Sequence, residues 1–158
     1  MGSEHAPLTV FATNERGTLA ALQHAKSITA RSPSPVLVLV PELVEYGTPF
    51  RARRVNGNGN GNGHENGNGT GSVERSFRDL ASRVGLDVAI RTCQCREPKH
   101  VSGRLGLAPS RIVLGGRWRG WLATSEQQLA RELACDGHDV TFVDVDTGAT
   151  HHFEAVHA

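Results

Sequence analysis

Apolar residues in this chain fall into two patterns, short continuous runs and stripes with a three- or four-residue spacing. Continuous runs predict strands that are buried on both faces of a sheet. The predicted strands are Leu8–Ala12, Val36–Val40 (ended by Pro41), Val88–Thr92, Arg111–Leu114 and Val140–Val145. A further strand, Thr150–Val156, is expected to return as a hairpin after the turn-forming residues Asp146–Gly148.

The helix-spaced stripes lie between these runs. The first follows a cap at Asn14 and continues to about Ala30, and the second begins at a cap on Ser72 and ends at Gly85. Pro98 predicts the start of a short helix. The last stripe ends at Gly137, and either Thr124 or Ser125 fits its cap, because a Gln follows each at the capping-box spacing.

Strands that alternate with helices predict an α/β fold with an open, parallel, five-stranded sheet and helices on both faces. The fold class is Rossmann-like or flavodoxin-like, with strand order 3-2-1-4-5 and the added C-terminal strand antiparallel to its neighbour. Ligands bind such sheets beyond the carboxyl ends of the strands, where the strand order reverses. Two segments therefore matter most, Thr13–Asn14 after the first strand and Gly115–Ser125 after the fourth.

Residues 1–158 have a length that suits one domain. Residues 56–71, between the second strand and the second helix, are mostly alternating Asn and Gly, so we expect a flexible insert that buries nothing. Arg51, Arg53 and Arg54 precede it, and we expect a solvated flank there rather than a partner or nucleic-acid contact. The net charge of +1 gives no broad surface for nucleic acid or an anionic membrane.

Neither a membrane span nor an export signal is predicted. The apolar run at Val36–Val40 is far shorter than the roughly 20 residues that cross a bilayer. The first ten residues lack the basic region and apolar stretch of a secretory signal. Three cysteines cannot all pair, which favours a reducing, cytoplasmic compartment.

The element order, together with Ile112–Gly120 (IVLGGRWRG) and the following Thr124–Glu126 (TSE), resembles the universal stress protein family. Members typically read I-V-M-G-S-R-G-R-G-G at the first stretch and, after a longer loop, Gly-Ser at the start of the helix. The resemblance covers Leu8 to Val145 and implies a regulatory or interaction domain of the stress response.

Nucleotide-binding members wrap ATP phosphates with Gly-x2-Gly-x9-Gly-Ser/Thr and place an Asp after the first strand. Backbone N–H groups at a helix N-terminus hold the phosphates there. Here Gly115 matches the first Gly, but Trp118 stands at the second, Ala123 replaces the last, and Thr13 replaces the Asp. The loop is also shorter. We therefore expect no ATP binding in the family mode and no cofactor. An indole stands where the backbone should be bare, and if it fills the phosphate site, Trp118→Gly should open that site.

Two hypotheses remain for the function. The first is a non-catalytic interaction domain that has lost the nucleotide. The second is a sensor that binds an adenine nucleotide or another anion, since Arg117 and Arg119 can hold an anion beside a helix start. The candidate binding residues are Thr13, Asn14, Gly115, Gly116, Arg117, Arg119, Gly120, Thr124 and Ser125.

The sequence supports neither an enzyme nor a metal site. Asp146-Thr-Gly148 matches the aspartic protease tripeptide, but a turn between two strands demands the same residues. Cys93 and Cys95 with His100, or His151 and His152 with His157, lack metal-ligand spacing. We expect the two adjacent histidines to point to opposite faces of their strand.

Universal stress proteins commonly dimerise through the fifth strand, and the added strand Thr150–Val156 would occupy that edge. Either a homodimer forms through these C-terminal edge strands or the chain is a monomer. A dimer is slightly favoured.

Overall fold

The computed structural model describes residues 7–46, 70–97 and 108–156. Strands and helices alternate along these residues, as the apolar pattern predicts. Their bounds are β1 (Leu8–Phe11), α1 (Glu15–Arg31), β2 (Val36–Leu43), α2 (Thr70–Val84), β3 (Val88–Cys95), β4 (Arg111–Gly116), α4 (Ser125–Cys135), β5 (Asp139–Asp144) and β6 (Thr150–Phe153). The insert at residues 56–69, the three arginines before it and the short helix expected from Pro98 lie outside the described residues.

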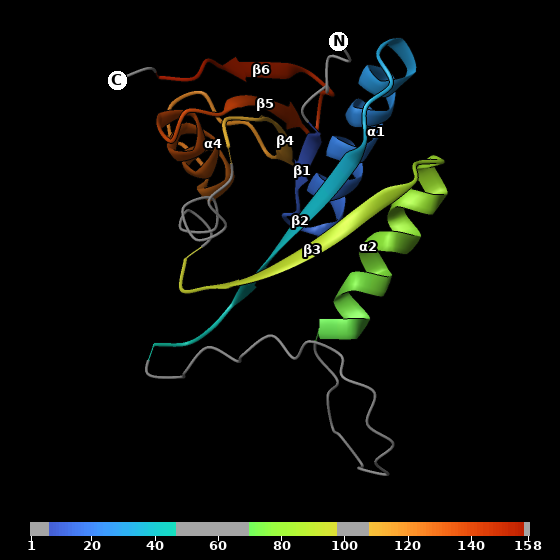
Figure 1. Cartoon of the computed structure of the whole chain (residues 1–158). Helices are drawn as coiled ribbons and strands as arrows, with labels where there is room; N and C mark the ends of the chain where they lie inside the picture. Colours follow the sequence, from blue (N-terminus) through green and yellow to red (C-terminus); the bar gives the residue numbers. More distant parts are fainter. Residues whose placement is uncertain (1–6, 47–69, 98–107, 157–158) are drawn as a thin grey trace, which may run out of the picture.

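The strands form one sheet in the order β3-β2-β1-β4-β5-β6 (Figure 1). Strands β1 to β5 are parallel, and β6 runs antiparallel to β5. The predicted fold class, strand order and added strand are thus confirmed. The order reverses between β1 and β4, so the segments after these two strands meet at one edge of the sheet.

The core has two layers, one on each face of the sheet. Helices α1 and α2 cover one face and α4 covers the other (Figure 1). Neighbouring residues of a strand belong to different layers: Val10 packs in the α1–α2 layer and Phe11 in the α4 layer. The continuous apolar runs follow from this double cover, because both faces of each strand need apolar side chains.

Cap residues explain where the helices begin and end. The Asn14 side chain accepts a hydrogen bond from the Gly17 amide (2.8 Å) at the start of α1. Thr124, rather than Ser125, caps α4, and its capping box with Gln127 is complete. Gly85 ends α2 with a φ of +82°, a backbone conformation that suits glycine.

Helix α2 begins earlier than predicted. It starts at Thr70, so the cap at Ser72 is wrong, and residues 70 and 71 belong to the helix rather than to the insert. Val73, the first residue of the apolar stripe, is 42% exposed, while Leu80 is buried. The first turn of α2 therefore lies outside the core, and its start cannot be read from the apolar stripe.

Strand β2 continues past Pro41, which was predicted to end it. Pro41 pairs in register with Cys93 of β3, and the strand runs to Leu43. The Ala12 amide donates to the Leu39 carbonyl, so odd-numbered residues of β2 point their backbone groups toward β1. β1 ends at Phe11, beside Leu39, so no ladder bond is lost at Pro41.

The other differences between the predicted and the observed strands are small shifts of the strand ends. β3 extends to Cys95, β5 is shifted by one residue toward the N-terminus, and β6 ends at Phe153 instead of Val156. Across the described residues, no helix combines the length and the apolar character needed to cross a membrane.

Candidate functional site

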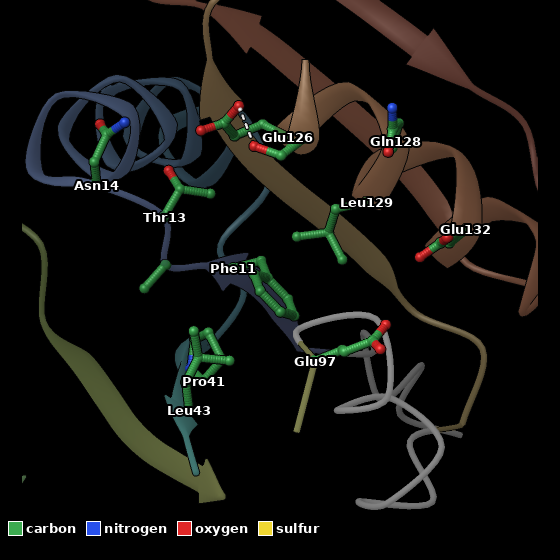
Figure 2. A pocket seen from close by; sticks show the side chains of 12 residues that line it. Phe11, Thr13, Asn14, Pro41, Leu43, Glu97, Glu126, Gln128, Leu129 and Glu132 are labelled. Atoms are coloured by element: carbon green, nitrogen blue, oxygen red, sulfur yellow. Dashed lines mark hydrogen bonds between the residues drawn. The ribbon is translucent and has the colours of Figure 1, made fainter. Parts of the chain in front are cut away.

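The predicted site lies at the carboxyl ends of β1, β2 and β4, where two hollows adjoin. The first, which we call the apolar hollow, has a volume of about 510 Å³. Figure 2 shows Phe11, Pro41 and Leu129 projecting into it, with Glu97 and Glu132 on one side and Thr13 and Asn14 on the other. The described residues that line it are Phe11, Ala12, Thr13, Asn14, Pro41, Leu43, Glu97, Ser125, Glu126, Gln128, Leu129 and Glu132.

The second hollow, which we call the cationic hollow, has a volume of about 540 Å³. It is lined by Asn14, Glu15, Arg16, Arg117, Arg119, Thr124, Ser125, Glu126 and Val145. Asn14, Ser125 and Glu126 line both hollows, so the two are neighbours across the start of α4. The structure thus brings the segments after β1 and β4 together, as the sheet order predicts.

Thr13 and Gly115 hold the two segments in contact. The Thr13 hydroxyl donates to the Gly115 carbonyl (2.8 Å), and the Thr13 amide donates to the Thr18 hydroxyl (3.0 Å). A Cβ on Gly115 would lie 2.1 Å from the Gly17 carbonyl oxygen, and one on Gly17 would lie 2.3 Å from the Gly115 oxygen. Gly115 therefore serves the close crossing of α1 over β4, and Gly17, its partner, was not identified from the sequence.

The loop after β4 is fastened to the first turn of α4. The Arg119 amide donates to Gln127 Oε1 (2.9 Å), and Gln127 Nε2 donates back to the Arg119 carbonyl (3.0 Å). The Thr124 hydroxyl donates to the Arg117 carbonyl (3.0 Å). Gln127 is buried, so these bonds are shielded from water. The sequence pattern identified Gln127 as part of a cap, but not as the residue that positions Arg119.

This loop places two arginine side chains beside the start of α4. Arg117 and Arg119 line the cationic hollow together with Ser125. The amides of Ser125 and Glu126 are the first two of α4, and in the described part of the chain neither donates to an acceptor. Amides at a helix start attract anions, and guanidinium groups bind carboxylates and phosphates. The arrangement can therefore hold an anion.

Two of the predicted glycines have different roles. A Cβ on Gly116 would lie 2.8 Å from the Glu126 Cβ, so a side chain at position 116 would collide with the first turn of α4. A Cβ on Gly120 would meet no atom within 4 Å. Gly116 thus lets α4 approach β4 closely, whereas the structure gives no steric reason for Gly120.

Carboxylates reduce the positive charge of the cationic hollow. Asp146 forms ion pairs with Arg117 (3.0 Å) and Arg16 (3.7 Å). Glu126 lines both hollows, and its carboxylate accepts a hydrogen bond from the Ser125 hydroxyl (3.2 Å). Glu97 and Glu132 add negative charge around the apolar hollow.

Trp118 packs against β5 and β6, so the structure does not support an indole that fills either hollow. Its ring stacks on His151 with centroids 3.6 Å apart and contacts Phe142 and Phe153. The residues described as lining the two hollows do not include it. An indole gains more from burial against the aromatic side chains of β5 and β6 than from an open, polar hollow.

Asp144 at the end of β5 fixes the turn that carries Asp146. Its carboxylate accepts hydrogen bonds from the Thr147 hydroxyl (2.8 Å) and from the amides of Asp146 (3.1 Å) and Trp118 (3.4 Å). Burial raises the pKa of Asp144, but these bonds and the charge of His151 outweigh it, so the pKa lies below its ordinary value. The sequence pattern did not identify this residue.

The remaining candidates lie elsewhere. Asp146-Thr-Gly148 forms the turn before β6, with Gly148 at a φ of +73°, as the turn interpretation predicts. Cys93 and Cys95 are buried in the α4 layer. In the described residues no group of three acidic, histidine or cysteine side chains could hold a metal ion. His100 and His157 lie outside those residues.

Of the comparisons with known proteins, only the one with solved structures finds a similarity, and it is a similarity of fold. No family model matches the chain, and no characterised protein matches its sequence. The fold is similar to the crystal structure of a universal stress protein in complex with cAMP, with a TM-score of 0.55 and 16% sequence identity. The match covers 90% of this chain and 99% of the other. The chain therefore has the fold of a universal stress protein.

Proposed function

We propose that this chain is a non-catalytic regulatory domain of the universal stress protein type that binds a small nucleotide with a single phosphate, and not ATP in the family mode. The observation that carries the proposal is the shared wall of the two hollows, formed by Asn14, Ser125 and Glu126. A ligand across this wall would place a planar ring against Phe11 and Leu129 and an anion at the arginines.

The charge of the cationic hollow supports a ligand of low charge. Arg16, Arg117 and Arg119 line it against Glu15 and Glu126, and Asp146 pairs with two of the arginines. The three carboxylates offset the three guanidinium groups, so a single negative charge is favoured over the several charges of a triphosphate. The solved universal stress protein of the same fold holds cAMP, which carries one negative charge.

The loop after β4 argues against the family's way of binding ATP. That mode needs a glycine backbone around the phosphates, whereas Trp118 packs on β5 and β6 and Gln127 fastens Arg119 to α4. The loop cannot wrap around a triphosphate without breaking these contacts.

A non-catalytic role is supported by how the polar side chains of the site are used. The hydroxyls of Thr13 and Thr124 and the amide of Gln127 all hold backbone groups in place. These side chains therefore serve the structure of the site, which favours a binding role over a catalytic one. The sequence holds three cysteines, an odd number that suits no full set of disulfides, and this supports a cytoplasmic, reducing location for the domain.

Calorimetric titration with cyclic AMP, AMP and ATP tests the proposal. We expect cyclic AMP or AMP to bind more tightly than ATP, and Arg119→Met to weaken binding by roughly tenfold, as expected for a charged hydrogen bond. Arg131→Met is the matched control, because Arg131 is exposed on α4 and lines neither hollow in the described structure. Tight ATP binding by the natural chain, or equal effects of both variants, would contradict the proposal.

A second candidate function is an interaction domain without a nucleotide. The loop after β4 exposes Trp121 (98%) and Leu122 (66%), an uncommon position for such large apolar side chains. Under this alternative the same titrations release no heat with any nucleotide, and a protein partner would cover the loop.

A further inference from the structure

Asp146 lies between two arginines of the cationic hollow. One carboxylate oxygen contacts Arg117 Nε at 3.0 Å, and the other lies 3.7 Å from an Arg16 guanidinium nitrogen. Arg16 belongs to the first turn of α1 and Arg117 to the loop after β4, so Asp146 joins the two segments that form the hollow. Asp146 is not among the described residues that line the hollow, but its carboxylate contacts two arginines that do, so its charge acts on an anion held by them.

The position of Asp146 is fixed by hydrogen bonds, not by the ion pairs alone. Its amide donates to Asp144 Oδ1 (3.1 Å), the same oxygen that accepts from the Trp118 amide (3.4 Å). The Thr147 hydroxyl donates to the other Asp144 oxygen (2.8 Å), and the Gly148 amide donates to the Asp144 carbonyl (2.8 Å). The buried Asp144 therefore anchors both the turn that carries Asp146 and the residue next to Arg117.

We propose that Asp146 is a specificity-determining residue that selects ligands by charge, a role that rests on the proposed function of the cationic hollow. Its carboxylate already satisfies part of the hydrogen-bonding capacity of Arg117 and repels each negative charge that enters. A ligand with one negative charge meets this repulsion once, whereas a ligand with several charges meets it several times. The carboxylate therefore makes the free energy of binding less favourable in proportion to the charge of the ligand.

Asp146→Asn tests this role, because asparagine keeps the size and the backbone amide of the turn and removes the charge. The matched control is Asp79→Asn, which removes the same charge from the exposed face of α2. We expect Asp146→Asn to tighten ATP binding by roughly tenfold and cyclic AMP binding by less than about threefold, since an exposed ion pair changes affinity only modestly. The control should change neither, and the effect should fall as salt rises.

Inorganic phosphate and pyrophosphate separate this inference from the proposed function. If no nucleotide binds but Asp146→Asn tightens pyrophosphate more than phosphate, the nucleotide proposal fails and the charge-selecting role stands. If nucleotides bind and both variants behave alike, or all ligands tighten equally, the role of Asp146 is overturned while the nucleotide site stands. If no anion binds to any variant, both are overturned.

Discussion

At the scale of single residues, the closest packing in the site is between two glycines. Gly115 and Gly17 allow α1 to cross β4, and a Cβ on either would lie within 2.3 Å of a backbone oxygen. Backbone atoms cannot move aside as the end of a flexible side chain can. Gly115→Ala should therefore lower the free energy of unfolding by about 3 kcal/mol or more, as for severe overpacking.

Urea denaturation followed by circular dichroism measures this loss. Gly120→Ala is the matched control, because a Cβ there meets no atom within 4 Å and should change the free energy of unfolding by less than about 0.5 kcal/mol. Equal effects of the two substitutions would mean that α1 does not approach β4 as closely as described.

A buried histidine makes stability depend on pH. His138 is 2% exposed, and its Nδ1 accepts a hydrogen bond from the Ser110 amide (3.2 Å). Burial lowers the pKa of His138 below its ordinary value of 6.5, and the nearby Asp136 carboxylate opposes this only partly. Between the two pKa values the unfolded chain binds a proton that the folded chain does not, so stability decreases as pH falls below about 6.5.

We expect His138→Asn to reduce this decrease, because asparagine can still accept from Ser110 and does not titrate. The measurement is the free energy of unfolding at several pH values below neutrality. His152→Asn is the control, since His152 is exposed. Part of the decrease should remain, because burial and the charge of Arg111 also lower the pKa of His24. An unchanged pH dependence in His138→Asn would contradict the prediction.

At the scale of helices and strands, the sequence predicts what local patterns determine. Apolar runs and stripes set the type of the elements and their order along the chain, and this alternation predicts a parallel sheet with helices on both faces. The meeting of Thr13 with Gly115 follows once β1 and β4 are neighbours in that sheet. Contacts between distant elements set the rest. Pro41 is compatible with β2 because β1 ends before it and needs no hydrogen bond from it. Trp118 packs outside the two hollows because β5 and β6 offer aromatic partners.

The same distinction applies to the candidate site. The sequence identified the segments that bear Arg117, Arg119 and Thr124, because a loop after a parallel strand is a position where ligands bind. It did not identify Asp144 or the second role of Gln127, since both act across 8 or more residues of chain. An element that begins at a cap is predictable, whereas a side chain that joins two loops is not.

At the scale of the whole molecule, the outer edge of the sheet is where we expect a second copy to bind. Phe142 and Asp144 direct their backbone groups toward β6, because the Asp144 amide donates to the Ala149 carbonyl. In the register of the hairpin, His151 and Phe153 of β6 then face β5, and Thr150 and His152 direct their backbone groups outward. This edge can pair with an identical strand of a second copy, and we expect a homodimer through it.

His152→Pro tests the dimer, because proline removes an outward amide without removing a bond to β5. Sedimentation equilibrium at micromolar concentrations should show a dimer for the natural chain and a monomer for His152→Pro. His152→Ser is the matched control: it removes the imidazole, keeps the amide, and should remain a dimer. If His152→Ser dissociates as well, the imidazole and not the strand edge holds the copies together. A natural chain that sediments as a monomer would show that β6 closes the sheet, since its polar, four-residue edge would then protect the strand from pairing.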